Sequence, residues 1–367
     1  MAKWKISQGM PILNKEMEDA VLDALRNDKY VNGENVTKLE EEFARYIGTE
    51  HAIAVSSGTN ALAFIFMAAG IKGRKCTTSP QSFIASANSI LHAGGTPVFA
   101  DIDKDTYCIS TAEVEKQLNN GASAVLPVDI FGYPADFDSI NEIAGRKNAY
   151  VIEDACQAHG AIYKGKRAGS LALAAAFSFY PSKNMTVLGD GGMVTTDDDG
   201  IANKVRKLRD AGRKSHYEHD MIGYTARLNT VNAAIGRVQL RNLDKWNAKR
   251  TGIAAEYGSR LKNVNGIKLP QLGSNGIKPV FHQYVICTKD RDRLKEHLEK
   301  NGIQCGIHYP IPIHLQPIYR EMFKHKEGEY PTSESFSREC LSLPMHINLT
   351  KDDAKLICEQ IEGFYGS

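Results

Sequence analysis

The sequence predicts an α/β protein with a mostly parallel central sheet, and two observations indicate this fold class. Between about residues 50 and 196, short apolar stretches alternate with helix-like stretches, as in a series of right-handed β-α-β units. The chain has 367 residues, which is enough for two domains and a substantial core. We therefore expect a large domain over residues 1–245 and a smaller C-terminal α+β domain over residues 246–367.

Several helices outside the sheet region are predicted from apolar residues that recur at helical spacing. In residues 16–25, for example, Met17 and Val21 share one side of the predicted helix. A long helix is expected to begin after Asn229, which fits an N-cap position, and to reach Trp246 between the two domains. The other predicted elements are helices over residues 36–46, 201–211, 291–300 and 352–365, and a strand over residues 280–288.

One lysine follows a predicted buried strand. Residues 176–179 form a near-continuous apolar run that is followed by Pro181 and Lys183, so this amine lies at a strand end. Burial or a neighbouring cation can lower the pKa of such a lysine from about 10.4, and the free amine can then form a Schiff base with a carbonyl. The alternative interpretation is a solvated loop lysine, and two motifs upstream argue against it.

These two motifs also follow predicted strands. The apolar residues 150–152 lead into Glu153 and Asp154, and the small residues Ser56-Ser57-Gly58-Thr59 lead from another strand into a helix. Backbone N–H groups that open a helix suit a phosphate. A phosphate cradle, an acid and an amine are the groups needed to hold pyridoxal phosphate (PLP), because the acid keeps the pyridine nitrogen protonated and the ring then accepts electrons. The combination predicts a PLP site.

The motifs lie in longer stretches that resemble the sugar aminotransferases of the DegT/DnrJ/StrS family. The resemblance covers nearly the whole chain and implies the fold type I architecture of aspartate aminotransferase. The matching stretches, in family order, are Ser56-Ser57-Gly58-Thr59, residues 82–88, residues 97–103, Glu153-Asp154-Ala155-Cys156-Gln157-Ala158-His159-Gly160, residues 177–184 and residues 308–319.

The resemblance implies which residues hold the cofactor. Lys183 would bind it covalently and move a proton between substrate and cofactor, and Asp154 would pair with the pyridine nitrogen; these are the expected catalytic residues. Phe83 lies where the family has an aromatic residue that stacks on the ring, with core packing as an equal alternative, and His159 is interpreted as structural. The remaining expected contacts are Gln157 with the phenolic oxygen, and Gly58, Thr59, Ser178 and Thr225 with the phosphate.

The segment Arg213–Thr225 is expected to reach a neighbouring subunit. Family members commonly have Gly-Tyr-Asn where this chain has Gly223-Tyr224-Thr225, and a threonine hydroxyl reproduces only part of the hydrogen bonding of an amide. Arg213 and Tyr217 suit an anionic nucleotide, although they lie far in sequence from the cofactor motifs. We therefore expect a homodimer with shared active sites; the alternative is a mobile surface loop on a monomer.

A proline-rich loop over residues 306–317 contains two histidines, His308 and His314. The interleaved prolines exclude a helix, and no carboxylate or cysteine lies at ligand spacing, so we expect no metal site. A rigid loop that presents Tyr309 suits a bulky polar substrate. The expected substrate contacts are Tyr180, Arg213, Tyr217, Tyr309 and His314.

Three functions follow from the resemblance. The first is a PLP-dependent transfer of an amino group, expected from L-glutamate, to a keto-sugar nucleotide, with a slight preference for a 3-keto 6-deoxy or acetamido sugar over a 4-keto sugar. The second is the dehydratase branch of the family, whose members have histidine at the lysine position, so that Lys183 argues against it. The third is a regulatory protein without enzyme activity, but the sequence has no basic stripe and no additional helical domain.

Composition predicts a cytoplasmic enzyme. The chain has 45 basic and 43 acidic residues, and this near balance argues against nucleic acid or a membrane surface as a partner. Its seven cysteines include no C-x-x-C pair, as expected for reduced thiols in a reducing compartment. The apolar run at residues 61–71 is too short to cross a bilayer, and residues 1–5 precede no apolar signal core.

Overall fold

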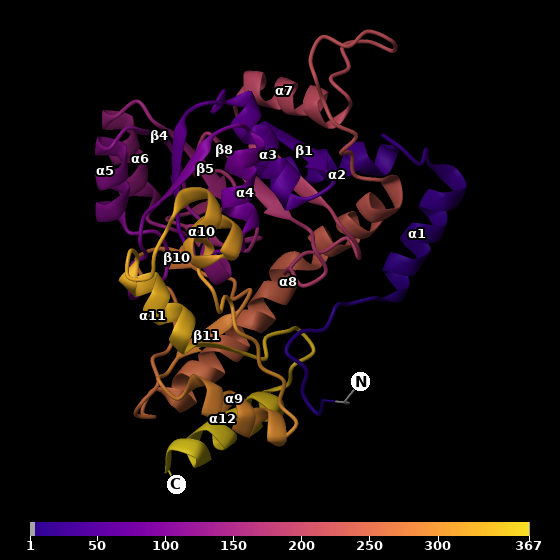
Figure 1. The fold of residues 1–367 in the computed structure, drawn as a ribbon. Coiled ribbons are helices and arrows are strands. Elements are labelled where there is room, and N and C mark those ends of the chain that lie inside the picture. The colour runs from indigo at the N-terminus through magenta and orange to yellow at the C-terminus, as the bar shows by residue number, and fades with distance from the viewer. Residues whose placement is uncertain (1–3, 367) are drawn as a thin grey trace.

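The computed structural model describes residues 4–366, and its largest element is a seven-stranded sheet with helices on both faces (Figure 1). The strand order is β3, β2, β4, β5, β8, β9, β1. Only β9 runs antiparallel to its neighbours, so the predicted α/β class with a mostly parallel sheet is confirmed. The strands are β1 His51–Val55, β2 Lys75–Thr78, β3 Thr96–Phe99, β4 Ala122–Leu126, β5 Tyr150–Asp154, β8 Ala174–Ser178 and β9 Gly192–Thr196.

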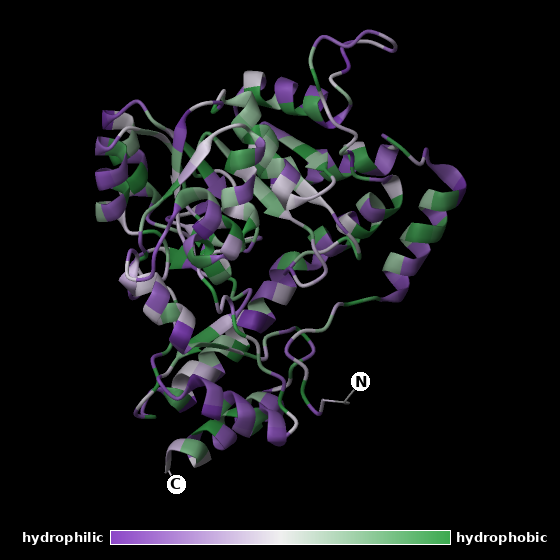
Figure 2. Ribbon diagram, in the orientation of Figure 1, coloured by the Kyte–Doolittle hydropathy of each residue, from purple (hydrophilic) through white to green (hydrophobic). Residues whose placement is uncertain are grey.

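Alternating side chains of these strands enter two cores, one on each face of the sheet. Ile152 and Ala176 point to the face covered by α3, α4 and α7, whereas Phe177 points to the face covered by α2 and α8. Farther along that second face, α5 and α6 cover β4 and β5. Figure 2 shows hydrophobic residues in the central strands and α3, and more hydrophilic residues on the outer helices. These helices are α2 Glu34–Ile47, α3 Gly58–Ala68, α4 Ala85–His92, α5 Thr111–Asn119, α6 Phe137–Arg146, α7 Asp199–Arg209 and α8 Thr230–Leu261.

Helix α8 connects the sheet to the C-terminal part of the chain. Its N-cap is Asn229, whose side chain accepts a hydrogen bond from the backbone N–H of Asn232, as the sequence predicts. Its first half packs against α2 and against α1 (Lys15–Asn27), where Trp246 joins a small core with Met17. Its last turns bury Tyr257 in the C-terminal core. The predicted domain boundary after residue 245 falls inside this helix and stays a prediction.

The C-terminal core contains a two-stranded antiparallel sheet between helices. Its strands are β11 Tyr284–Cys287 and β12 Cys340–Leu343, and its helices are α9 Arg291–Lys300 and α12 Lys351–Gly366, whereas Phe336 of α11 Pro331–Glu339 packs in the core under α5 and α6. The segment that precedes α1 also packs here. Ile6 pairs with Ile303, and the backbone carbonyl of Gln8 accepts a hydrogen bond from the N–H of Met345 at 3.1 Å. The beginning and the end of the chain therefore share one core.

Most predicted helices agree with the structure to within two residues at each end, but the strand predicted over residues 280–288 is shorter. The backbone N–H groups of Val280 and His282 bond to the carbonyls of Gly132 and Phe131, at 3.0 and 2.8 Å, instead of to another strand. Several short elements were not predicted. They are the three-stranded sheet of β6 Ile162–Tyr163, β7 Lys166–Arg167 and β10 Ile277–Lys278, the 3-10 turns Ile130–Gly132 and Ile313–Leu315, and α10 Pro317–Phe323.

The core between α2 and the sheet should dominate stability on that face. The ring of Phe43 is fully buried and meets Phe177 and Phe179 edge-on, with centroids 5.0 and 5.8 Å apart. We expect Phe43→Ala to lower the free energy of unfolding by about 3–5 kcal/mol, because it leaves a cavity. Urea unfolding of the cofactor-free protein measures the change. Leu22→Ala, at a side chain that is 43% exposed, should cost far less; equal losses would contradict this account.

Candidate active site

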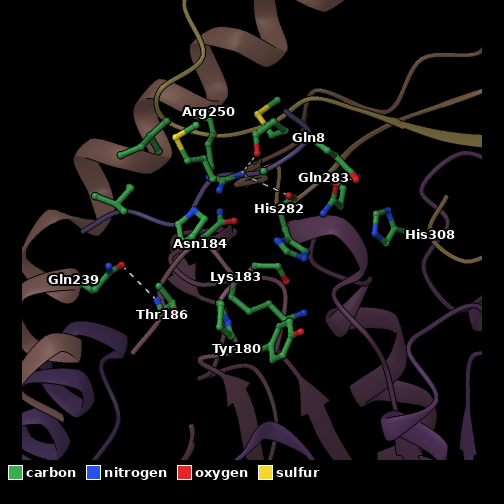
Figure 3. A pocket seen from close by; sticks show the side chains of 18 of the residues that line it. Gln8, Tyr180, Lys183, Asn184, Thr186, Gln239, Arg250, His282, Gln283 and His308 are labelled. Atoms are coloured by element: carbon green, nitrogen blue, oxygen red, sulfur yellow. Dashed lines mark hydrogen bonds between the residues drawn. The ribbon is translucent and has the colours of Figure 1, made fainter. Parts of the chain in front are cut away.

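The candidate site lies where β5 and β8 end and α3 begins. Two cavities meet there and share five wall residues, among them Lys183 and Tyr309. The first, of about 470 Å³, reaches Asp154 and Gly58, and we call it the strand-end cavity. The second, of about 370 Å³, reaches Arg250 on α8, and we call it the Arg250 cavity (Figure 3). The other shared wall residues are Tyr180, Ser182 and His308.

Lys183 stands between the two cavities. It follows β8 in a turn that its backbone N–H closes on the carbonyl of Tyr180 at 2.9 Å. Burial lowers the pKa of Lys183 below that of an ordinary lysine, and the charge of Asp154 partly opposes this effect. The free amine, which is the nucleophilic form, is therefore present at a lower pH than for a solvated lysine.

Asp154 ends β5 and is almost fully buried. One carboxylate oxygen accepts a hydrogen bond from the hydroxyl of Ser86 at 2.7 Å, and the other accepts from the backbone N–H of Cys156 at 3.2 Å. Ser82 lies 2.7 Å from the Ser86 hydroxyl and extends this chain of hydrogen bonds. The sequence analysis missed both serines as site residues, although they lie four apart at the start of a helix.

Two further carboxyl groups lie behind Asp154 and face the interior. Burial raises the pKa of Glu153 to about 7, although its carboxylate accepts hydrogen bonds from the backbone N–H groups of Gly169 and Leu171. Burial also raises the pKa of Asp129, and the charge of the neighbouring Glu153 adds to this effect. The raised pKa values of these two carboxyl groups limit the negative charge behind Asp154.

The phosphate end of the site is the N-terminus of α3. Ser57 is its N-cap and accepts a hydrogen bond from the N–H of Asn60 at 3.1 Å. A Cβ at Gly58 would lie 2.8 Å from the Cβ of Ser178 and 2.9 Å from the Sγ of Cys156, so only glycine fits between them. Thr59 and Ser178 also line this end of the strand-end cavity. The free N–H groups at this helix start fit a phosphate.

The opposite wall is aromatic. Phe83 is 55% exposed and lines the strand-end cavity, so the alternative of core packing is wrong for this residue. Its ring centroid lies 6.1 Å from that of Tyr309. Gln157 accepts a hydrogen bond from the N–H of Phe131 at 2.7 Å and donates one to the Tyr309 hydroxyl at 3.3 Å. The carboxylate, amine, helix N-terminus and aromatic wall are together the set of groups that PLP requires.

Four predicted site residues lie outside both cavities. Arg213, Tyr217 and Thr225 belong to the loop after α7, which projects from the sheet in Figure 1, and Tyr217 is 88% exposed. Their contacts with nucleotide or phosphate stay predictions. His314 is fully buried, and its ring bonds to Glu334 at 3.1 Å. We therefore correct its predicted contact with substrate to a structural position.

His159 occupies the structural position that the sequence suggests. It is fully buried against the rings of Phe177 and Phe179, and burial lowers its pKa to about 3, with Lys183 as a smaller cause. Within residues 4–366, no group of three or more His, Cys, Asp or Glu side chains could hold a metal ion.

Apart from Tyr180, Lys183 and Tyr309, the residues of the Arg250 cavity were not predicted. Arg250 comes from α8, His282 and Gln283 from the segment before β11, and Gln8 from the segment before α1 (Figure 3). Asn184, next to the lysine, completes one side by donating hydrogen bonds to Asn247 and to the carbonyl of Val280, both at 3.0 Å. No local motif signals this set, because its members are brought together only by the tertiary fold.

Comparisons with known proteins give consistent matches. The model of the DegT/DnrJ/EryC1/StrS aminotransferase family matches residues 11–362. A "Pleiotropic regulatory protein" of Geobacillus stearothermophilus is 38% identical over 98% of this chain and 97% of its own. The "dTDP-3-amino-3,4,6-trideoxy-alpha-D-glucose transaminase" of Streptomyces venezuelae is 38% identical over 95% of this chain and 92% of its own.

A solved structure has the same fold. The crystal structure of S. venezuelae DesV in complex with a ketimine intermediate superposes with a TM-score of 0.93 at 38% identity, over 96% of this chain and 95% of that one.

In the part of this chain that the structure describes, no helix is both long enough and apolar enough to cross a membrane. The expected location in the cytoplasm stays a prediction.

The Ser86 hydrogen bond gives a direct test of the site. We expect Ser86→Ala to weaken PLP binding about tenfold, because Asp154 would lose the hydrogen bond that orients its carboxylate. A hydrogen bond to a charged group contributes about 1.5–3 kcal/mol. Fluorescence titration of the cofactor-free protein with PLP measures the dissociation constant. Ser89→Ala is the control, since Ser89 is equally buried on α4 but bonds to a backbone carbonyl. Unchanged PLP affinity in Ser86→Ala would refute this role.

Proposed function

The chain belongs to the DegT/DnrJ/EryC1/StrS aminotransferase family, and from this premise we propose that it transfers the amino group of L-glutamate to a keto-sugar nucleotide. Membership confirms the resemblance found in the sequence, and with it an aminotransferase that has PLP as its cofactor. The observation that carries the proposal is the position of Lys183, a buried amine between a cavity that fits PLP and a second cavity free for a substrate.

The residues of the strand-end cavity have separate tasks. Bound PLP supplies an electron sink for the carbon that carries the amino group. Asp154 holds the proton on the ring nitrogen, and Gly58 and Thr59 bind the phosphate at the start of α3. Lys183 binds the cofactor, and its free amine then takes a proton from the donor carbon and returns it at a neighbouring atom. Gln157 and Tyr309, which are hydrogen-bonded to each other and line the same cavity, would hold the cofactor ring.

For the acceptor, we propose a 3-keto sugar nucleotide before a 4-keto one. Support comes from the proline-rich loop that presents Tyr309 and from the relative named for a 3-amino sugar. Members of the dehydratase branch have histidine at the position of Lys183. The lysine in this chain therefore argues against a dehydratase. The second candidate is a regulatory protein without enzyme activity, which the name of the G. stearothermophilus relative favours. The lowered pKa of Lys183 and the phosphate site at the start of α3 argue against it, because a protein without a cofactor would need neither.

The first test uses Lys183→Ala. We expect the wild-type enzyme to transfer nitrogen from 15N-labelled L-glutamate to a dTDP- or UDP-linked 3-keto sugar. The rate of this transfer should fall at least about a thousandfold in Lys183→Ala, because the variant lacks the nucleophile and proton carrier. Mass spectrometry of the sugar nucleotide measures the transfer. Borohydride should fix PLP to Lys183 in the wild type. Lys245→Ala, an exposed lysine on α8, is the control. PLP trapped on another lysine would refute the assignment.

We also propose a homodimer with shared active sites. The loop over residues 213–225 supports it, because Tyr217 and Ile222 are 88% and 90% exposed and Arg213 is remote from both cavities of its own chain. A second subunit would bury these apolar side chains and could receive the loop at its site.

Mixing two inactive variants tests the shared site. We expect Lys183→Ala and an Arg213→Ala/Tyr217→Ala double variant to regain up to about one quarter of wild-type activity after subunit exchange, because half of the dimers are hybrids and each hybrid has one intact site. Activity is assayed before and after exchange, and differently tagged subunits prove the exchange. Proven exchange without recovered activity, or a fully active monomer in sedimentation, would contradict the proposal.

A further inference from the structure

The segment that carries Lys183 has no regular secondary structure of its own. It is the connection between β8 and β9, residues 179–191, which contains neither helix nor strand. The backbone N–H of Lys183 bonds to the carbonyl of Tyr180, which closes a turn but does not attach this turn to another element. A reactive group on such a segment needs anchors from rigid elements if it is to keep a fixed position.

Asn184, the residue after the lysine, supplies such an anchor. Its side chain is 6% exposed, and its Nδ2 donates to Oδ1 of Asn247 on α8 and to the backbone carbonyl of Val280, both at 3.0 Å. A carbonyl can only accept, so the contact with Val280 fixes which end of the Asn184 amide is the nitrogen. Both amide protons are used, and they join the turn to segments that lie 63 and 96 residues away in the sequence.

Asn247 extends this anchor to a third segment. It is 7% exposed, and its Nδ2 donates to the backbone carbonyl of His159, between β5 and β6, at 2.8 Å. The packing there is tight, because a Cβ at Gly160 would lie 2.8 Å from the same Nδ2. The side chains of Asn184 and Asn247, which we call the amide bridge, therefore connect the lysine turn through α8 to the strand that ends in Asp154.

A second contact comes from the same face of α8. Oε1 of Gln239 accepts a hydrogen bond from the backbone N–H of Thr186 at 3.4 Å, drawn as a dashed line in Figure 3. Gln239 and Asn247 are two steps of four residues apart, so both project from one side of the helix. The contact from Gln239 is long and lies three residues beyond the lysine. The amide bridge is the anchor directly beside Lys183.

We propose that Asn184 is a positioning residue, which through the amide bridge keeps the amine of Lys183 between the two cavities. Lys183 lines both cavities, so a shift of its turn would move the amine towards one of them. A misplacement of about 1 Å can slow an enzyme by about a hundredfold. This inference rests on the proposed function, because it takes Lys183 as the residue that binds the cofactor and moves the proton.

The test separates the orientation of the cofactor from the rate of the reaction. Circular dichroism of bound PLP in the visible range reports how the protein orients the ring, and it needs no substrate. We expect Asn184→Ala to change this signal per bound PLP. It should also lower kcat for the 15N transfer about 10- to 100-fold and leave the KM for L-glutamate within about twofold, because a displaced amine impairs proton transfer more than binding.

Asn141→Ala is the matched control. The Nδ2 of Asn141 also donates to a backbone carbonyl, that of Leu171 at 3.0 Å, but this residue lies on α6 outside both cavities. Asn141→Ala should therefore keep the dichroism of bound PLP and the kcat of the wild type, even where its melting temperature falls as much as that of Asn184→Ala.

A purely structural role for Asn184 predicts a different result. Asn184→Ala would then lose thermal stability but keep the dichroism of bound PLP and the kcat of the wild type, and this result would overturn the proposal. If Asn184→Ala does not fold, Asn247→Ala decides, because it breaks the same bridge from α8 and leaves the bond to Val280 in place. Altered dichroism with a lower kcat in Asn247→Ala supports the proposal, and wild-type values refute it.

The dichroism also separates this inference from the proposed function. If no keto-sugar nucleotide is aminated but Asn184→Ala alters the signal of bound PLP, the proposed acceptor is wrong and the positioning role stands. If keto-sugar nucleotides are aminated and Asn184→Ala matches the wild type in both measurements, the function stands and this inference fails.

Discussion

The parallel pairing of β5 with β8 is the constraint on which the site depends. It aligns Asp154 with Ala176, so the carboxylate that ends one strand lies beside the turn that carries Lys183 after the other. Ala174 and Ala176 of β8 face α3 and leave room for it, and Gly58 of α3 then approaches Ser178 closely. A larger residue at any of these contacts would separate the acid, the amine and the helix start.

Prediction from sequence succeeded where a group is fixed by its own strand or helix. Asp154 and Lys183 follow apolar runs and Gly58 opens a helix, so local pattern was enough to place them on one edge of the sheet. It failed where position depends on distant segments. His314 looked like part of an exposed loop, but contacts with Glu334 bury it completely. Arg250 lies among ordinary helix residues, and only the carbonyls of two remote segments aim it at the site.

The two cavities beside Lys183 differ in charge: carboxylates line the strand-end cavity, and an arginine lines the Arg250 cavity. On one side, Asp154 and Asp190 line the strand-end cavity, and the raised pKa values of Glu153 and Asp129 limit further negative charge behind Asp154. On the other side, Arg250 provides positive charge in an environment without acids. Burial is the main cause that lowers the pKa of the lysine, and its neighbours set where cationic and anionic parts of a ligand are stabilised.

The shared core of the two chain ends also has a consequence for synthesis of the protein. Residues 8–12 and Met345 both line the Arg250 cavity, and Gln8 is held there by a bond from Met345. During translation the sheet and its helices can form before the segment around Met345 leaves the ribosome, but this cavity cannot close until that segment is available. A nascent chain could thus form its central sheet early, whereas the Arg250 cavity is completed only after residue 345 has been synthesised.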